Sequence, residues 1–279
     1  MKAGYYIDEE EEMFSLDLSQ LRGLILDMDG VIWKKYHPLG DLKAIFERIA
    51  EQGRKVILAT NNSTQTPAHY LGLLAEFDVE LDPWQVIGSS QATAHYLSAK
   101  HPAGGPVYIV GEVGLHQALA EANFQHSTDE EDVLAVVVGL SLGIDYVTIA
   151  RAAQLIRGGA AFIGTNPDKT FPTPQGLYPG AGVMLAAVES ASGAKPTVIG
   201  KPQSGMYQVA LERLGTSPTE TLVVGDRLET DIAGAQRMGC HTALVLSGVA
   251  SLTDAQIWSP RPDIIAQDLT EVIDLLAQA

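Results

Sequence analysis

The sequence has a single cysteine, Cys240, among its 279 residues. An intrachain disulfide is therefore excluded, and a zinc site built from cysteines is not expected. Long apolar stretches are also lacking, and none approaches the ~20 residues that a membrane-spanning helix requires. Near the N-terminus, an acidic run at Asp8–Glu12 stands where a signal peptide would have an apolar segment. We therefore expect a cytoplasmic protein without a membrane partner.

Basic residues are few, with 18 lysines and arginines against 34 aspartates and glutamates, so the net charge is −16 with histidine neutral. Nucleic acids and anionic membranes bind to basic patches, and this balance argues against both partners. A complete glycine-rich dinucleotide motif is missing, and the seven histidines show no metal-ligand spacing. Hydrophobic residues make up 46% of the chain, which is enough for one large domain or two modest ones.

Strand-like and helix-like patterns alternate along the chain after an N-terminal arm at residues 1–20. Leu21–Leu26 is predicted to be a buried strand, followed by a helix at Asp41–Gly53 and a second strand at Lys55–Ala59. Thr66-Pro67 then opens another helix, as an N-cap followed by proline at the first helical position. This rhythm predicts an α/β fold with a doubly wound, Rossmann-like parallel sheet.

A hinge is expected at Asp82-Pro83, followed by a second series of strands and helices before the first pattern resumes. We therefore expect a core domain made of residues 21–82 and 196–279, with an α/β cap domain inserted at residues 83–195. The elements expected in the cap lie at residues 90–99, 106–110, 113–122, 133–138, 145–157, 160–163 and 180–192. Those expected in the second part of the core lie at residues 197–199, 203–214, 221–224, 231–238, 242–246, 263–265 and 269–277.

Two carboxylates, Asp27 and Asp29, follow the first expected strand and precede Gly30. Because side chains alternate along a strand, these acids share a side only at its open end. They repel each other there unless a cation or a shared proton intervenes. Mg²⁺ is the simplest partner, since hard cations take oxygen ligands. The stretch therefore predicts a Mg²⁺ site and phosphate chemistry.

Three further polar motifs each follow an expected strand. They are Thr60-Asn61-Asn62-Ser63, Gly200-Lys201-Pro202 and the segment from Gly225-Asp226 to Asp231. Taken singly, each is explained equally well by a turn, a loop or a helix cap. Together they would place acids, a hydroxyl, backbone amides and a lysine at the carboxyl ends of parallel strands, where ligands bind. Phosphoryl transfer requires such a set of groups.

These motifs resemble those of the haloacid dehalogenase-like superfamily, in its phosphatase branch. The matching stretches read LILDMDGVIW, ILATNNS, VIGKP and VVGDRLETDI, and VYIVGEVGL and GTNPDKTFPTPQGLYPGAG are similar on the cap side. More narrowly, the chain is similar to the subfamily of nucleotide, p-nitrophenyl phosphate, phosphoglycolate and pyridoxal phosphate phosphatases. That subfamily inserts a large α/β cap between its second and third motifs. The similarity runs from about Leu21 to the end of the chain.

The resemblance implies a catalytic role for the acids. Asp27 would be the nucleophile that forms an aspartyl-phosphate, and Asp29 would be the general acid for the leaving alcohol and then the base for water. The Asp27 carboxylate, the Asp29 main-chain carbonyl and Asp226 would hold Mg²⁺. Asp231 would support these ligands by orienting waters or Lys201.

The resemblance also implies how the phosphoryl group is held. Lys201 would neutralise charge between nucleophile and phosphoryl group, while the Thr60 hydroxyl and the Asn61 backbone amide would bind the transferring oxygens. The cap stretch around Pro167 has two interpretations. It either faces the substrate or is a turn whose shape the proline sets and which has no contact with the substrate. The candidate cap contacts are Thr165, Asn166, Asp168 and Phe171.

The function expected is the Mg²⁺-dependent hydrolysis of small phosphorylated metabolites. A phosphomutase or a dehalogenase on the same core is the alternative among enzymes. A receiver-like phosphate-binding protein also places acids, threonine and lysine at strand ends, but receivers are about half this length and lack a mid-chain insertion. A homodimer through the cap is a further expectation from the resemblance.

Overall fold

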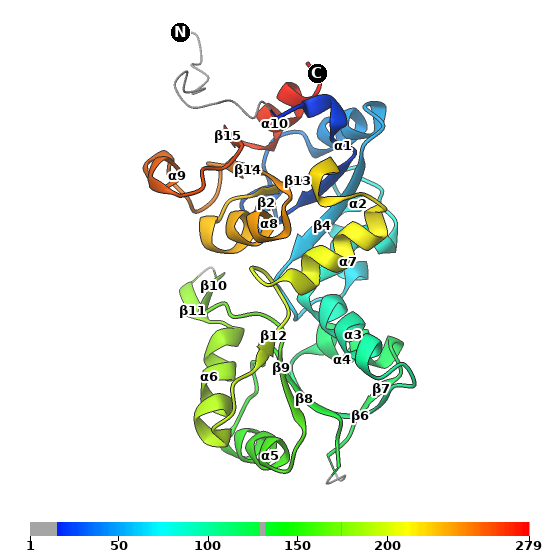
Figure 1. Cartoon of the computed structure of the whole chain (residues 1–279), viewed down its shortest axis with the longest axis vertical. Coiled ribbons are helices and arrows are strands. Elements are labelled where there is room, and N and C mark those ends of the chain that lie inside the picture. The colour runs from blue at the N-terminus through cyan, green and yellow to red at the C-terminus, as the bar shows by residue number, and fades with distance from the viewer. Residues whose placement is uncertain (1–15, 129–131, 174, 279) are drawn as a thin grey trace.

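The computed structural model describes residues 16–128, 132–173 and 175–278 (Figure 1). Of the expected N-terminal arm, only its last five residues fall within these ranges, and Leu18–Gln20 forms a short 3-10 turn, η1, capped by Asp17. The acidic run Asp8–Glu12 lies outside the described residues. Among the described helices, none combines the length and the apolar character that crossing a bilayer would demand.

A six-stranded sheet forms the upper half of the molecule in Figure 1, with the strand order β15-β14-β13-β1-β4-β5. Neighbouring strands are parallel throughout, and Gly23 of β1 pairs with Thr221 on one side and Lys55 on the other. The strands are β1 (Gly23–Leu26), β4 (Lys55–Thr60), β5 (Val86–Gly88), β13 (Thr221–Gly225), β14 (His241–Val245) and β15 (Ile264–Ala266).

Helices cover both faces of this sheet because successive side chains of β1 point to opposite faces. Leu24 and Leu26 pack in one apolar cluster with α1, α2 and α10, whereas Ile25 packs in another with α3, α7 and α8. The doubly wound α/β core predicted from the sequence is therefore confirmed. The core helices are α1 (Leu42–Glu51), α2 (Pro67–Ala75), α3 (Ser89–Lys100), α7 (Ser204–Leu214), α8 (Ala233–Met238), α9 (Leu252–Ile257) and α10 (Leu269–Leu276).

A second parallel sheet lies below the first and has the order β12-β9-β8-β6-β7 (Figure 1). Helices α5 and α6 pack together over one of its faces, and α4 packs beside α3 on the other. The strands are β6 (Gly105–Val110), β7 (Phe124–His126), β8 (Ala135–Val138), β9 (Ala161–Gly164) and β12 (Thr197–Val198). The helices are α4 (Val113–Glu121), α5 (Tyr146–Arg157) and α6 (Ala181–Ser192).

Two edge strands join a sheet other than the one that the expected domain ranges imply. Val86–Gly88 lies in the range expected for the cap, where no strand was predicted at these residues, and it pairs with β4 as the edge strand β5 of the core sheet. Thr197–Val198, expected in the core, pairs with β9 as the edge strand β12 of the cap sheet. Both are short and apolar, and nothing in such a segment encodes which neighbouring sheet it joins. The chain therefore crosses between the two units after α3 and again after β12.

Several short elements were not anticipated, because two- to four-residue strands carry too little alternation to be recognised. Two hairpins flank the space between the sheets, β2 (Trp33–Lys34) with β3 (His37–Pro38) and β10 (Thr170–Thr173) with β11 (Gly176–Pro179). The helix expected at residues 231–238 begins two residues later, as α8 (Ala233–Met238). The residues before it form a π-helical turn, η4 (Leu228–Ile232). The remaining short turns are η2 (Pro83–Gln85) and η3 (Pro218–Glu220).

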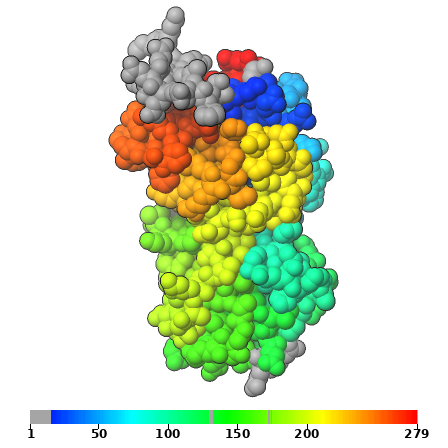
Figure 2. Space-filling model, viewed as in Figure 1, coloured from blue at the N-terminus to red at the C-terminus, as the bar shows by residue number. Residues whose placement is uncertain are grey.

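The two units pack as one elongated body, with the core lobe above the cap lobe in Figure 2. One apolar cluster is continuous between them, since it contains Ile25 of β1 and Met206 of α7 together with Val107 of β6 and Leu115 of α4. This shared cluster packs the core and the cap against each other, with the carboxyl ends of both sheets beside it.

Candidate active site

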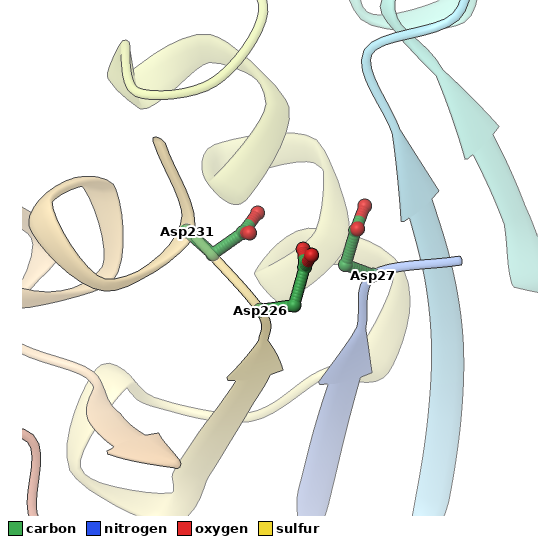
Figure 3. A group of neighbouring side chains, drawn as sticks. All are labelled: Asp27, Asp226 and Asp231. Carbon is green, nitrogen blue, oxygen red and sulfur yellow. The ribbon is translucent and has the colours of Figure 1, made fainter. Parts of the chain in front are cut away.

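Two neighbouring core strands end in aspartates. Asp27 follows β1 and Asp226 follows β13, and the main-chain N–H of Asp27 still donates to Val224 in the ladder (2.9 Å). Asp231 comes from η4 and turns back toward both (Figure 3). One carboxylate oxygen from each of the three lies within 4.8 Å of the other two. The predicted convergence of these acids is therefore observed.

The ammonium of Lys201 is buried among these acids, with Lys201 only 3% exposed. Its Nζ lies 2.5 Å from Asp27 Oδ1 and 2.7 Å from Asp231 Oδ1, and it donates to the main-chain carbonyl of Ala59 (3.0 Å). Burial disfavours its charge, but the carboxylates of Asp231 and Asp27 outweigh burial and raise the pKa of Lys201. The cation is thus held permanently beside Asp27.

Lys201 reaches the site from the cap sheet and not, as expected, from a strand of the core sheet. Beyond β12, the N–H of Ile199 donates to Gly164 (3.0 Å) and that of Gly200 to Thr165 (2.7 Å), so the pairing with β9 continues to the residue before Lys201. The expected strand at residues 197–199 is real, but its partner is β9.

The carboxylate of Asp226 lacks one partner. Asp226 is 1% exposed, and its Oδ2 accepts from the N–H of Val249 (2.8 Å), whereas Oδ1 is buried without a hydrogen bond from the described residues. Burial, together with the Asp231 carboxylate, raises the pKa of Asp226 to about 6. A side chain at Gly30 or Gly248 would collide with this carboxylate, so glycine is required at both positions. A buried carboxylate oxygen without a hydrogen bond can serve as a ligand for a cation.

The acidic group fits Mg²⁺ in donor type, because all its candidate ligands are carboxylate oxygens. Asp27 and Asp226 belong to both the predicted ligand set and the observed group. The Asp29 side chain does not belong to the observed group, and the ligand role of its main-chain carbonyl stays a prediction. Asp231 belongs to the group, and its Oδ1 lies 2.7 Å from the Lys201 ammonium. Its supporting role stays a prediction.

Asp29 opens onto the pocket beside the cluster and is accessible to solvent there. The protein atoms around the pocket still displace water from its carboxyl and raise its pKa, and the charges of Arg227 and Lys201 oppose that rise. The same carboxylate acts on Tyr36, whose pKa burial and Asp29 both raise. A carboxyl with a raised pKa holds its proton more readily at neutral pH, which suits a general acid.

The last residue of β4, Thr60, and the first residue after it, Asn61, lie at the pocket and are 5% and 9% exposed. Thr60 Oγ1 accepts from the N–H of Asn62 (3.1 Å), and Asn62 Oδ1 accepts from the N–H and hydroxyl of Thr64 (both 2.8 Å). The loop is therefore fixed by its own side chains, as its polar composition predicted.

The cap residues expected near the substrate divide into two groups. Asn166, Asp168 and Phe171 line the pocket, but Thr165 is fully buried and does not line it. A substrate contact by Thr165 is therefore not available in this arrangement. Asp168 is hydrogen-bonded by Asn61 Nδ2 (3.2 Å), and burial raises its pKa while Asn61, Arg227 and Lys201 oppose the rise. Phe171 packs edge-to-face on Tyr178 of the same hairpin, with ring centroids 6.3 Å apart.

The pocket has a volume of about 430 Å³ and lies between the carboxyl ends of both sheets. The sequence analysis did not place Lys35 and Tyr36 there, although both line it from the β2–β3 turn. Their φ angles are +52° and +65°, a conformation that favours glycine and asparagine. With neither residue type present, the sequence held no signal for this turn. Arg227 also lines the pocket.

Comparisons with known proteins agree with this geometry. Residues 24–125 match the family model described as haloacid dehalogenase-like hydrolase, and residues 198–272 match the HAD-hydrolase-like model. An acid sugar phosphatase from Staphylococcus aureus (strain USA300) is 36% identical over 92% of this chain and 98% of its own length.

Solved structures of phosphatases share the whole fold. A p-nitrophenyl phosphatase from Archaeoglobus fulgidus superposes with a TM-score of 0.86 at 30% identity, covering 91% of this chain and 99% of that one. A 4-nitrophenylphosphatase from Thermotoga maritima gives 0.85 at 29% identity, covering 92% and 98%. The chain therefore belongs to the haloacid dehalogenase-like hydrolases, in the subfamily of phosphatases that carry a cap domain.

Proposed function

We propose that the protein hydrolyses small phosphomonoesters in a Mg²⁺-dependent reaction that proceeds through an aspartyl-phosphate on Asp27. The observation that carries the proposal is the ammonium of Lys201, held at 2.5 Å from Asp27 Oδ1 and 2.7 Å from Asp231 Oδ1 in a buried acidic group. A structural ion pair would satisfy all its members, whereas this group leaves Asp226 Oδ1 without a partner.

In the first step, Asp27 attacks phosphorus and the bond to the leaving oxygen breaks. Burial raises the pKa of Asp27 well above its ordinary value, and the Lys201 ammonium opposes this rise, so Lys201 favours the ionised nucleophile. The same ammonium offsets charge that gathers on the phosphoryl oxygens. The Thr60 hydroxyl and the main-chain N–H of Asn61, at the end of β4, are further donors to the phosphoryl oxygens.

Asp29 gives its proton to the departing alcohol oxygen and then removes a proton from the water that cleaves the aspartyl-phosphate. Its exposed position in the pocket allows contact with both the alcohol and the water. Proton transfer by a positioned side chain contributes roughly 10²- to 10⁴-fold to such reactions.

Asp27, Asp226 and the main-chain carbonyl of Asp29 would hold Mg²⁺, and Asp231 would keep Lys201 in place. When bound, Mg²⁺ would supply positive charge for the acids and the phosphoryl oxygens. The unpaired Asp226 Oδ1 supports a ligand role for this residue.

The pocket volume favours small substrates, because cavities of about 300–1,000 Å³ enclose ligands of ordinary small-molecule size. One relative is named p-nitrophenyl phosphatase, another 4-nitrophenylphosphatase and a third acid sugar phosphatase, so p-nitrophenyl phosphate and sugar phosphates are the first compounds to be tested. The cytoplasmic location, the homodimer through the cap and the lack of nucleic-acid or membrane partners stay predictions.

The test measures phosphate release from p-nitrophenyl phosphate and a panel of phosphorylated metabolites. We expect turnover with Mg²⁺, loss with a chelator and recovery on adding Mg²⁺ back. Stable phosphorylation without phosphate release would favour a receiver-like protein, and transfer to a second substrate position would favour a mutase. Turnover that persists after metal removal would contradict the Mg²⁺ dependence.

A further inference from the structure

Asn61 joins the core to the cap through both its side chain and its main chain. Its Nδ2 donates to the main-chain carbonyl of Lys201 (3.0 Å) and to Asp168 Oδ1 (3.2 Å). Its carbonyl oxygen accepts from Asn166 Nδ2 (2.7 Å) and from the hydroxyl of Ser89 (2.6 Å). Since Asn61 and Asn166 are 9% and 4% exposed, water has little access to replace these bonds.

The two cap residues form one unit. Asn166 follows β9, and its Oδ1 accepts from the N–H of Asp168 (3.1 Å). The turn thereby presents a donor, Asn166 Nδ2, and an acceptor, Asp168 Oδ1, to the same core residue. The half-buried Asp168 also borders the pocket, but the hydrogen bond that its side chain makes in this structure is with Asn61.

On its other side, Asn61 is linked to the reacting groups. It follows Thr60 directly, and its carboxamide holds the main chain of the residue whose ammonium lies on Asp27. Asp168 is thus linked to Asp27 in three steps: a hydrogen bond to Asn61, a hydrogen bond from Asn61 to the main chain of Lys201, and the bond from the Lys201 ammonium to Asp27.

We propose that Asn166 and Asp168 are positioning residues that act through Asn61, so that seating the cap orients the phosphoryl-binding loop and Lys201. This proposal rests on the proposed function, because it takes Asn61 and Lys201 to hold the phosphoryl group. It gives the two cap residues a task different from the selective substrate contact expected from the sequence.

The two roles have different kinetic consequences. The phosphoryl group is common to all substrates, so loss of a positioning residue lowers kcat by a similar factor for every substrate. Loss of a leaving-group contact changes the order of preference among substrates. Asp168→Ala is expected to lower kcat by about 10- to 100-fold, the size of effect that small misplacements of reacting groups produce. Asp168→Asn keeps an oxygen acceptor for Asn61 and is expected to recover most of this loss.

A double-mutant cycle tests the path directly. Asn61→Ala, Asp168→Ala and the double variant are assayed with p-nitrophenyl phosphate and a sugar phosphate, and thermal melts confirm that each is folded. If Asp168 acts through Asn61, the double variant is no slower than Asn61→Ala within about twofold, because contacting residues of one network are not additive. Asn166→Asp, which loses the donor to Asn61, is expected to slow both substrates alike.

Phe171→Ala is the matched control, since Phe171 lines the same pocket from the cap without a hydrogen bond to Asn61 in the described structure. It is expected to change the ratio between the two substrates. Multiplicative losses in the cycle, or a changed substrate ratio in Asp168→Ala, would overturn the positioning role.

If Asn61→Ala melts below the assay temperature, the comparison of Asp168→Ala with Asp168→Asn replaces the cycle. Equal losses of kcat in these two variants would reject the positioning role. If the unmodified protein releases no phosphate from any substrate, the proposed function itself fails. If the unmodified protein is active but the kcat losses of Asn61→Ala and Asp168→Ala multiply in the double variant, only the positioning role is rejected.

Discussion

The core sheet and the cap sheet have similar architectures but bring different functional groups to the site. Both are parallel, both carry helices on two faces, and strands of both end at the same pocket. The carboxylates of Asp27 and Asp226 come directly after the core strands β1 and β13. The ammonium of Lys201 and the carboxamide of Asn166 come two or three residues after the cap strands β12 and β9.

The difference shows why the cap is more than a cover. Buried carboxylates need a countercharge, and in this protein the edge strand of the cap sheet delivers part of it. A change among the core carboxylates is therefore expected to abolish chemistry, and a change at the junction to damage both chemistry and stability. A change in the cap hairpin, β10 with β11, is expected to alter selectivity.

The largest effect is expected on the core side, for Asp27→Asn. The amide cannot act as the nucleophile, so turnover should fall by at least about 10³-fold. The change is nearly isosteric, and Lys201 keeps its pairing with Asp231, so the melting temperature should change little. Residual activity within tenfold of the parent would contradict the nucleophile assignment.

Lys201→Met at the junction should affect activity and stability together. Removing the ammonium leaves Asp27 and Asp231 buried without their shared cation. We expect turnover to fall by roughly 10²- to 10³-fold, comparable to the loss of a donor that stabilises transition-state charge. The free energy of unfolding should fall by about 3 kcal/mol, as for other broken buried pairs.

Lys43→Met is the control for that measurement. Lys43 forms an exposed ion pair with Asp78 at 3.8 Å, with side chains 53% and 77% accessible. Its loss should change unfolding by less than about 1 kcal/mol in a urea titration. Similar destabilisation by both variants would argue that Lys201 has no special electrostatic role.

Gly248→Ala tests, within the core, whether Asp226 belongs to the metal site. The added Cβ would collide with the Asp226 carboxylate, and we expect the Mg²⁺ concentration for half-maximal activity to rise about 10- to 100-fold. Gly72→Ala is the same chemical change in the exposed part of α2, where nothing lies within 4 Å, and it should leave activity intact. An unchanged Mg²⁺ requirement in Gly248→Ala would remove Asp226 from the metal site.

The smallest effect is expected for Phe171→Ala in the cap hairpin. The variant loses an aromatic surface at the pocket and the contact with Tyr178. One hydrophobic contact is worth roughly 10-fold or somewhat more in discrimination, so the ratio of kcat/KM between aryl and alkyl phosphates should shift by about this factor. A uniform loss across substrates would show that the hairpin supports the fold and not the selection.

Most regular elements and the core motifs could be predicted from the sequence, because apolar periodicity and strand-end polarity are local signals. Asp27, Thr60 and Asp226 lie where their strands predicted. Lys201 was predicted in the site but for the wrong sheet, since β12 is two residues long and its partner depends on tertiary packing. Tyr36 was missed because its turn lacks glycine and asparagine.

The cap contacts were harder to predict for a physical reason. Whether Asn166 and Asp168 face substrate or core depends on how the two units pack, and no local pattern encodes that packing. The structure places both against Asn61, a long-range contact across more than one hundred residues.

The most direct test of the account is to trap the intermediate. The protein is mixed with a radiolabelled phosphomonoester and Mg²⁺, quenched in acid within one turnover, reduced with borohydride and digested for mass spectrometry. We predict label retained after the quench and conversion of Asp27 to homoserine, both absent in Asp27→Asn. Rapid phosphate release with no trapped label, or reduction at another acid, would contradict the assignment of Asp27 as the nucleophile.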